Sequence, residues 1–439
     1  MNNSPHSTAA PGARAHRLLT RLVTVQPGEL GALAASFLYF YLLLCAYYII
    51  RPIRDEMLIA NGVDNVQWLL LLTMCVLLAI TPAFGWITSR FRTRQFLSYC
   101  TLFFASHLVV FFFLFDVEQR SINVTRAFFV WVNVFNMFIV SLFWSFMNDV
   151  FGEGQAKRLF AFIAAGGTAG ALTGPVITTT LVETIGLSYL LLISAAVLST
   201  TVGCIYWLSQ WQNPQHDAST HSPHRTHQGA ALKGSIWGGF TLILRSPYLL
   251  GICAFIVLYA ISITFVQIQQ AQMIESAYTD PTARTKLFSQ IDFAANALTL
   301  VFQLFLTSRL ISWIGYRATL LLIPAGITLG FAVMAVSPLL AVMIAVEVFR
   351  RSGDYAIMKP TREMLFSVVD REEKYKAKNF IDTAVLRSGN TSSAWLFAGI
   401  KGLGATGATV AGISLALGVI WCTVAFWLGG KFLERSAEP

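Results

Sequence analysis

The feature that most constrains the fold of this chain is a succession of long apolar runs. A helix needs roughly 20 apolar residues to cross the hydrocarbon core of a bilayer. Only 12% of the 439 residues are charged, which is about half the share found in soluble domains. We therefore predict an all-α integral membrane protein with twelve transmembrane helices. The predicted spans are Leu30–Ile50, Val66–Thr88, Gln95–Phe115, Ala127–Phe146, Leu159–Val182, Leu187–Trp211, Tyr248–Gln272, Phe288–Trp313, Ala318–Val336, Leu339–Tyr355, Phe380–Leu403 and Thr406–Leu428.

The distribution of Lys and Arg predicts how these spans are oriented. Most of the 31 basic residues fall in segments on the same side as the N-terminus. The exceptions are Arg51, Arg54, Arg120, Arg126, Arg284, Lys286 and Lys401. Because cytoplasmic loops carry the excess of basic residues, we predict that both termini are cytoplasmic and that the membrane is a bacterial-type inner membrane. The net charge of +9 follows from this topology, so it indicates no nucleic-acid partner.

Two pairs of similar segments predict an internal repeat. The loop GWITSRFRTR (Gly85–Arg94) resembles the short loop motif of the major facilitator superfamily, and SWIGYR (Ser312–Arg317) stands at the corresponding place six spans later. EGQAKRLF (Glu153–Phe160) before the fifth span aligns with EKYKAKNF (Glu373–Phe380) before the eleventh. Two six-helix halves are the design of major facilitator transporters, so we predict two pseudo-symmetric halves.

The repeat divides the chain into five predicted parts. Residues 1–29 form a cytoplasmic tail, 30–211 the first bundle, 212–246 a linker that ends in a short interfacial helix, 247–430 the second bundle, and 431–439 a second tail. The linker contains the polar stretch Asn213–Lys233, which predicts disorder. Its four histidines are read as hydrophilic linker residues rather than metal ligands.

The most charged part of the chain begins and ends inside apolar runs. Glu347, Arg350, Arg351 and Asp354 follow one such run. Asp382, Arg387 and Asn390 precede another. Charges inside membrane helices are costly, so they usually pair and face a bundle interior or a water-filled path. We predict that these two spans line a transport pathway, with the i,i+4 pairs Glu347–Arg351 and Arg350–Asp354 acting as gates or structural locks.

The end of the first span carries a second group of charges. Arg51 and Asp55 are four residues apart, so they share a helical face and are predicted to pair. Pro52 is predicted to kink or end the helix. Arg54 lies beside them. Two interpretations stay open: a rim of snorkelling charges, or a charged cluster at the mouth of a cavity.

Polar side chains also occur in the fourth and eighth predicted spans. Asn133 and Asn136 lie in the fourth, and Asp292 and Asn296 lie in the eighth. Membrane amides are commonly interhelical hydrogen-bonding groups. A buried Asp292 is a candidate proton or substrate site; the alternative is a solvated carboxylate near the end of its span.

No motif for a metal, a cofactor or catalysis is found. The six cysteines all fall in apolar spans without a CxxC pair, which argues against a zinc site or a disulfide framework. Gly166, Gly170 and Gly174 recur at four-residue intervals. That spacing favours close helix packing, although GxxxGP in this span also resembles an antiporter motif. We therefore predict no cofactor, no bound metal and no enzymatic activity.

Four segments together resemble one family. They are YYIIRPIRDEM (Tyr47–Met57), SLFWSFMNDVFGEGQAKRLFAFIAAGG (Ser141–Gly167), KPTREMLF (Lys359–Phe366) and KAKNFIDTAVLRSGNTS (Lys376–Ser392). They are similar to the nucleotide transporters of plastids and intracellular bacteria, the ATP/ADP translocase branch of the major facilitator superfamily. The resemblance assigns family motif positions to Arg54, Asp55, Lys359, Thr361, Arg362, Glu363 and Asp382. The chain departs from the family at Val132 and Asn133, where an acid is usual, and around Asn390, where a lysine is usual.

These observations define two predicted sets of functional residues. Guanidinium groups grip phosphate or carboxylate in a bidentate manner, so Arg54 and Arg387 are the leading anion ligands. The predicted substrate-binding set is Arg51, Arg54, Asp55, Asn133, Asn136, Asp292, Asn296, Glu347, Arg351, Asp382, Arg387 and Asn390. The predicted gate or salt-bridge set is Arg90, Asp149, Arg158, Arg350, Asp354, Lys359, Arg362 and Glu363.

The predicted function is secondary active transport of an anionic small metabolite by alternating access. A nucleotide or another phosphorylated compound is the leading substrate, with a proton or a counter-substrate as the coupled species. Two alternatives stay open: a proton-coupled permease or exporter of a neutral or amphipathic solute, and a non-transporting membrane scaffold with the same fold. The expected partners are the substrate, a coupling proton or counter-substrate and the bilayer, and no nucleic acid. The protein is predicted to be a monomer.

Overall fold

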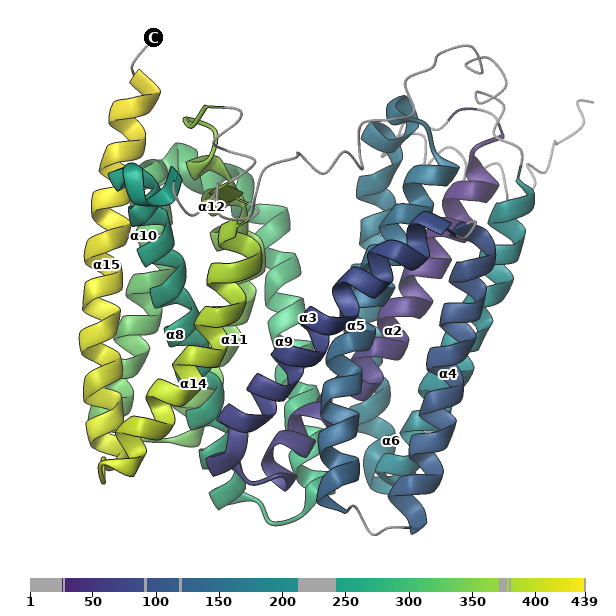
Figure 1. Ribbon diagram of the computed structural model, residues 1–439, viewed down its shortest axis with the longest axis horizontal. Helices are drawn as coiled ribbons and strands as arrows, with labels where there is room; N and C mark the ends of the chain where they lie inside the picture. The colour runs from purple at the N-terminus through teal and green to yellow at the C-terminus, as the bar shows by residue number, and fades with distance from the viewer. Residues whose placement is uncertain are drawn as a thin grey trace, which may run out of the picture.

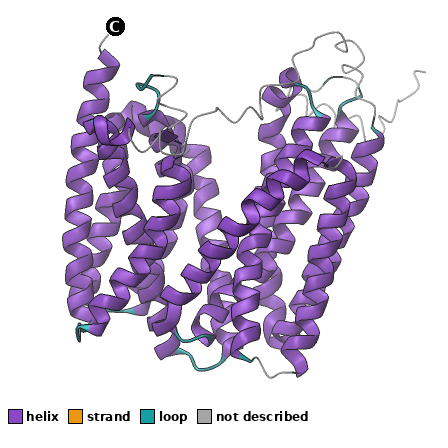
Figure 2. Ribbon diagram, viewed as in Figure 1, coloured by secondary structure: helices purple, strands orange, loops and turns teal. Residues whose placement is uncertain are grey.

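The computed structural model describes residues 26, 28–90, 93–117, 121–211, 242–370, 377–378 and 380–437, and every regular element in these ranges is helical (Figure 2). The helix that begins at Pro281 has a side-chain cap: the Asp280 carboxylate accepts the backbone N–H groups of Thr282 and Ala283 at 3.2 and 3.0 Å, an N-cap arrangement. The elements are α2 (Leu30–Ala60), a 3-10 turn (Val63–Asn65), α3 (Val66–Arg90), α4 (Thr93–Val117), α5 (Ile122–Val150), α6 (Glu153–Gln210), α8 (Pro247–Ala277), α9 (Pro281–Phe305), α10 (Thr307–Val336), α11 (Leu340–Gly353), α12 (Lys359–Leu365), α14 (Leu386–Gly402) and α15 (Gly407–Ala437), with π-helical turns at Asp354–Met358 and Ile381–Val385.

Nine helices in the described part of the chain are long and apolar enough to cross a membrane. One of them, α6, has 58 residues and would measure about 87 Å if straight, roughly twice the thickness of a bilayer. It contains a non-helical residue, Gly186, with φ 79°. On either side of it, Thr178 donates to the Ile49 carbonyl at 3.1 Å and Ser194 donates to the Ala46 carbonyl at 2.9 Å. Since both reach the same turn of α2, the chain reverses at Gly186.

Two helical segments are not among those nine. The run from Leu340 to Leu365 is continuous through α11, a π-helical turn and α12, and it would measure about 39 Å at 1.5 Å per residue. The second run joins the π-helical turn Ile381–Val385 to α14. Each π-helical turn divides its run into pieces of 17 residues or fewer. These are the two charge-rich segments, so the charges lie on long helical runs that the π-helical turns interrupt.

The helices gather into two bundles that stand side by side (Figure 1). One continuous hydrophobic core is formed by α2, α4, α5 and α6. A second core is formed by α8–α15 together with Ile59, Val63 and Val66 at the end of α2 and the start of α3. We call α2–α6 the first bundle and α8–α15 the second bundle. α3 leans from the first bundle toward α14 of the second (Figure 1).

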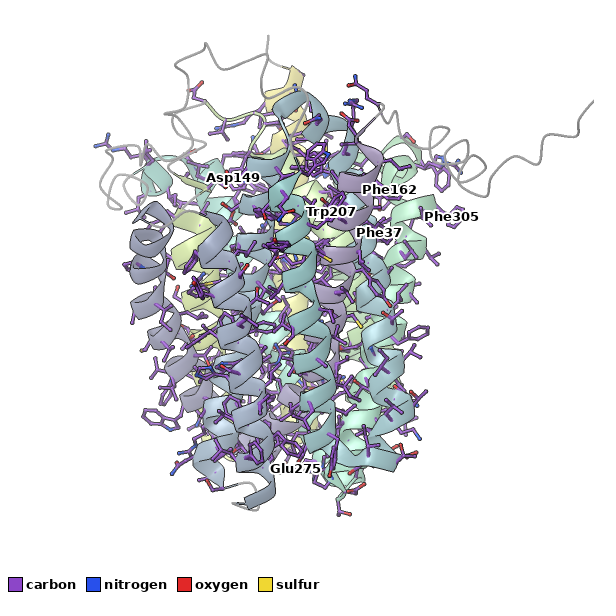
Figure 3. All side chains as sticks on the ribbon, turned by 90° about the vertical axis from the view of Figure 1, so that its right-hand side faces the viewer. Phe37, Asp149, Phe162, Trp207, Glu275 and Phe305 are labelled. Atoms are coloured by element: carbon purple, nitrogen blue, oxygen red, sulfur yellow. The ribbon has the colours of Figure 1, made fainter. Side chains whose placement is uncertain are left out.

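The ends of the bundles define two faces. The C-terminal end of α15 lies on one of them, at the top of Figure 1. We call this the linker face, because α6 ends and α8 begins there, and we call the other the opposite face, where α8 ends and α9 begins. Figure 3 places Asp149 toward the linker face and Glu275 toward the opposite face.

The glycine stripe predicted to mediate packing is confirmed as a close helix contact. A Cβ atom on Gly170 would lie 2.2 Å from the backbone oxygen of Tyr41, and one on Gly166 would lie 2.4 Å from that of Phe37. Gly174 faces Tyr48 and the Cys45 carbonyl in the same way. Small residues therefore let α6 approach the backbone of α2 directly.

Several predicted helix ends are wrong. Pro52 does not end the first helix, because buried residues on both sides of it, such as Ile49 and Ile53, hold α2 in place to Ala60. The eighth predicted span is shifted, since its helix begins at the Asp280 cap and ends at Phe305 rather than Trp313. The last helix is longer than the predicted twelfth span, because α15 continues past Leu428 to Ala437. Most of residues 1–29 and of the predicted linker, with its histidines, lies outside the described residues.

Candidate functional site

Asp292 of α9 lies at the centre of a buried ion-pair network between the bundles. Its side chain is fully buried. One carboxylate oxygen lies 3.7 Å from Nε of Arg51 on α2, and the other pairs with Nη1 of Arg351 on α11. We call Arg51, Asp292 and Arg351 the Asp292 cluster. The alternative of a solvated Asp292 is therefore wrong, and two cations compensate its buried charge, as a membrane interior requires.

Arg54 on α2 takes the partner that the sequence suggested for Arg51. Its Nε and Nη2 atoms lie 2.9 and 2.5 Å from Oδ1 of Asp55. Its Nη1 donates to Oδ1 of Asn133 on α5 at 3.5 Å. The predicted Arg51–Asp55 pair is thus wrong, because Arg51 turns toward the second bundle while Asp55 is held by its neighbour.

The predicted ion pairs on α11 are also wrong. Glu347 binds Arg350 in a bidentate geometry, with both N···O distances at 2.7 Å, and both residues are buried. Asp354 instead accepts the hydroxyl of Tyr259 at 2.5 Å and lies 3.6 Å from Nζ of Lys359. The i,i+4 spacing along α11 therefore predicted the wrong partners. Arg351 pairs with Asp292, which lies on another helix, α9.

A cavity of about 230 Å³ opens beside this network, lined by α2, α3, α5, α8, α9, α11 and α14. Seven predicted substrate-binding residues are on its wall: Arg51, Arg54, Asp55, Asn133, Glu347, Arg351 and Asn390. The sequence-based set omitted Thr264, Gln267, Gln270 and Phe129, which also line it. The glutamines could have been identified as amides within an apolar span, whereas nothing in the sequence distinguished Phe129 from the other phenylalanines.

Four buried polar atoms of residues that line the cavity have no hydrogen-bond partner in the described structure. They are Nε of Arg51, Nε2 of Gln270, Nη2 of Arg351 and Oδ1 of Asn390. A buried polar group without a partner costs about 1–3 kcal/mol. These atoms are potential donors and acceptors for water or a polar ligand at the cavity.

The other five predicted substrate-binding residues lie off the cavity wall. Asn296 donates to the Ala171 carbonyl at 2.7 Å and accepts the Tyr48 hydroxyl at 3.4 Å, so it joins α9 to the first bundle. The guanidinium of Arg387 lies 3.6 Å from the Met137 sulfur of α5. Asp382 pairs with Arg362 at 3.3 Å. Asn136 is half-buried on α5. Asp292 does not line the cavity, but its two partners Arg51 and Arg351 do.

The predicted gate residues fall into separate places. Lys359 pairs with Asp354, Arg362 with Asp382, and Glu363 with Lys378, all within the second bundle. Asp149 is exposed near the linker face (Figure 3). Arg90 belongs to α3, and its side chain lies outside the described residues.

Arg158 at the start of α6 forms an ion pair with Glu29, which immediately precedes α2. The distance from Nη2 to Oε1 is 3.0 Å. Glu29 also accepts the Gln26 backbone N–H and the Gln155 side-chain amide, both at 2.9 Å. Burial acts to raise the pKa of Glu29, but these hydrogen bonds and the Arg158 charge outweigh it, so the pKa is lowered from its usual value. The contact therefore ties together two helix starts of the first bundle.

The two bundles touch along a line of contacts that approaches the opposite face. Ser289 of α9 donates to the Pro175 carbonyl at 2.6 Å, and Thr179 donates to the Ser289 hydroxyl at 3.0 Å. Lys286 and Glu183 form an ion pair at 2.7 Å nearby. Between α3 and α14, the rings of Trp68 and Trp395 pack edge to face with their centroids 4.7 Å apart. Together with the Asp292 cluster, these contacts hold the bundles together.

Comparison with solved structures shows which fold this is. A bacterial homologue of the iron transporter ferroportin, in an inward-facing state, matches with a TM-score of 0.61 at 14% identity, covering 93% of this chain and 99% of that one. A mutant of the nucleoside transporter NupG matches with a TM-score of 0.60 at 13% identity, covering 92% and 99%. The chain therefore has the helical fold of multi-pass membrane transporters.

Sequence relatives narrow the assignment. ADP,ATP carrier protein 1 of Chlamydia trachomatis is 24% identical over 96% of this chain and 92% of its own length. The carrier of the same name from Chlamydia pneumoniae is 22% identical over 96% and 95%. These relatives are transporters, in agreement with the prediction of a transporter rather than an enzyme. A family model described as TLC ATP/ADP transporter matches residues 127–336 and 327–432. The predicted resemblance is thus confirmed, and the chain belongs to the TLC ATP/ADP transporter family.

Proposed function

We propose that this protein is a secondary transporter that exchanges nucleotides, with ATP and ADP as the leading pair. The observation that carries the proposal is the cavity between the bundles, whose wall presents the guanidinium groups of Arg51, Arg54 and Arg351. Guanidinium groups bind phosphate oxygens in pairs. Two carriers that match this chain over 96% of its length are named for ADP and ATP, which supports the same class of substrate.

The cavity suits the charged end of such a substrate. Its volume of about 230 Å³ lies below the roughly 300–1,000 Å³ typical of whole small-molecule sites. We therefore assign the phosphate chain to the cavity. The unpartnered Nη2 of Arg351 can donate to a phosphate oxygen, and the unpartnered Oδ1 of Asn390 can accept from a ribose hydroxyl.

The proposed topology has twelve membrane spans in two six-helix halves. Nine candidate spans, one of which reverses at Gly186, and the two charge-rich runs support that number. Residues 30–211 and 247–430 form the two halves, joined by residues 212–246. With the basic residues distributed as they are, the linker face and both termini are cytoplasmic, and the membrane is a bacterial inner membrane.

Transport proceeds by alternating access around the Asp292 cluster. In the present conformation the bundles are joined toward the opposite face, so that side is closed. A phosphate group competes with Asp292 for Arg51 and Arg351, which loosens the connection between the bundles and permits the opposite face to open. An empty site re-forms the Asp292 pairs, because unpaired buried guanidinium groups are costly. Because the empty site is held closed by these ion pairs, the protein changes conformation only with an anion bound. It therefore exchanges one anion for another.

The test is counterflow in proteoliposomes loaded with ATP, ADP and other phosphorylated metabolites, with labelled ATP outside. Saturable accumulation is expected, and it should fall at least tenfold in Arg51→Gln and in Arg54→Gln. Arg309→Gln is the matched control, since Arg309 is exposed near the linker face and off the cavity wall. Arg387→Ala tests the anion ligand expected from the sequence.

Absence of accumulation by folded protein refutes the nucleotide proposal. Unphosphorylated solutes are then screened under a proton gradient, with Asp292→Asn as the variant. Uptake that depends on the gradient and on Asp292 would support a proton-coupled permease. Absence of any transport would support the scaffold alternative.

A further inference from the structure

Tyr355 is an exposed aromatic ring in an otherwise buried part of the second bundle. It belongs to the π-helical turn Asp354–Met358, and 45% of its surface is accessible. Its neighbours Asp354, Ala356 and Ile357 are each at most 7% exposed. A π-helical turn inserts an extra residue into a helix and is frequent at functional sites. In this turn the Tyr355 ring is exposed, whereas the residues next to it are buried.

The surroundings of Tyr355 are cationic. The Lys359 ammonium lies 3.8 Å from the centroid of the ring, a cation–π contact. Arg351, which lines the cavity, precedes Tyr355 by four residues on the same continuous helical run. The ring is therefore about one helical turn, roughly 6 Å along the axis, from one member of the Asp292 cluster.

The charges beside the ring favour water over lipid on its open side. Lys359 has 45% of its side chain exposed and pairs with Asp354. An ion pair exposed to the hydrocarbon of the bilayer is costly, whereas such pairs are common along an aqueous pathway. Lys359 occupies one face of the ring, so the accessible area belongs largely to the rest of it.

We propose that the Tyr355 ring, backed by Lys359, is the platform on which the aromatic base of the substrate stacks while its phosphates bind Arg51 and Arg351. The inference rests on the proposed nucleotide function and deepens it, because it assigns the base as well as the phosphates. Stacking on an aromatic side chain tolerates every base, since each base has a π-face. The platform thus favours nucleotides over phosphorylated sugars without choosing strongly among bases.

The experiment measures equilibrium binding to the full chain in detergent, with two probes that share a ribose phosphate. Adenosine monophosphate carries a base and ribose 5-phosphate does not. The wild type is expected to bind the first more tightly. Stacking is worth about 1–3 kcal/mol per base, which corresponds to roughly 5- to 150-fold in affinity. Tyr355→Leu is expected to lose that preference, and Tyr355→Phe is expected to keep it.

Tyr278→Leu is the matched control, because Tyr278 is 38% exposed but lies between α8 and α9 at the opposite face. Equal affinity of the wild type for the two probes overturns the platform while leaving phosphate binding, and hence the proposed function, intact. Equal weakening of both probes in Tyr355→Leu also overturns it, since that pattern indicates a structural role. Failure of the wild type to bind either probe refutes the platform, whereas the proposed function is decided separately by the counterflow of labelled ATP.

Discussion

Replacing the buried Asp292 with Asn should destabilise the protein more than neutralising any single carboxylate on its surface. The substitution keeps the shape of the side chain but removes the charge that Arg51 and Arg351 share. Both arginines remain largely buried, with 14% and 7% of their side chains exposed. Two cations would then lie next to each other between the bundles without a counter-charge.

The magnitude follows from the geometry. At about 4 Å and an effective dielectric constant near 20, an ion pair is worth on the order of 4 kcal/mol before desolvation. Removing one partner of a buried pair typically costs about 3–5 kcal/mol, because the other charge stays buried. We expect a loss of about 3–5 kcal/mol in the free energy of unfolding for Asp292→Asn. Arg351→Met in the same chain should recover part of it, since fewer unpaired charges remain.

The assay is denaturant unfolding in mild detergent, followed by tryptophan fluorescence and arranged as a double-mutant cycle. Glu183→Gln is the control, because its ion pair with Lys286 has side chains 56% and 32% exposed and such surface pairs contribute about 0–1 kcal/mol. The reasoning is refuted if Asp292→Asn costs no more than Glu183→Gln, or if the Asp292 and Arg351 substitutions simply add. Either result would mean that the cluster is hydrated rather than buried.

Two further predictions concern the first bundle. Gly170→Val should prevent folding or lower the unfolding midpoint sharply, because even a Cβ would lie 2.2 Å from the Tyr41 carbonyl; Gly203→Ala, with nothing within 4 Å of the added atom, should be neutral in the same thermal assay. The lowered pKa of Glu29 means that its contribution to stability is present above the unfolded value of about 4.5 and is lost as pH falls through the folded value. The wild type should therefore lose stability relative to Glu29→Gln below about pH 5, and parallel melting curves from pH 7 to pH 3 would contradict this.

The sequence identified correctly those features that depend on residues near each other along the chain. Apolar runs identified the membrane helices, because the length of a span is set by the thickness of the bilayer. The four-residue spacing of Gly166, Gly170 and Gly174 placed small residues on one face of a helix and so predicted a close contact, which α2 makes. The cost of charge in a membrane marked Arg351 as a residue needing a partner, and for Arg51 and Asp292 it left a solvated position as the alternative.

The identities of those partners came only from the tertiary structure. Spacing along one helix suggested Arg51–Asp55 and Glu347–Arg351, yet Arg51 and Arg351 both bind Asp292, because α2, α9 and α11 converge between the bundles. The π-helical turn that exposes Tyr355 has no sequence signature comparable to a glycine or a proline. A buried charge is compensated by the opposite charge that lies nearest to it in space. Which residue that is depends on how the chain turns back and packs its helices against one another. The sequence therefore determined that a charge buried in the membrane must be paired, and the packing of distant helices decided with which residue.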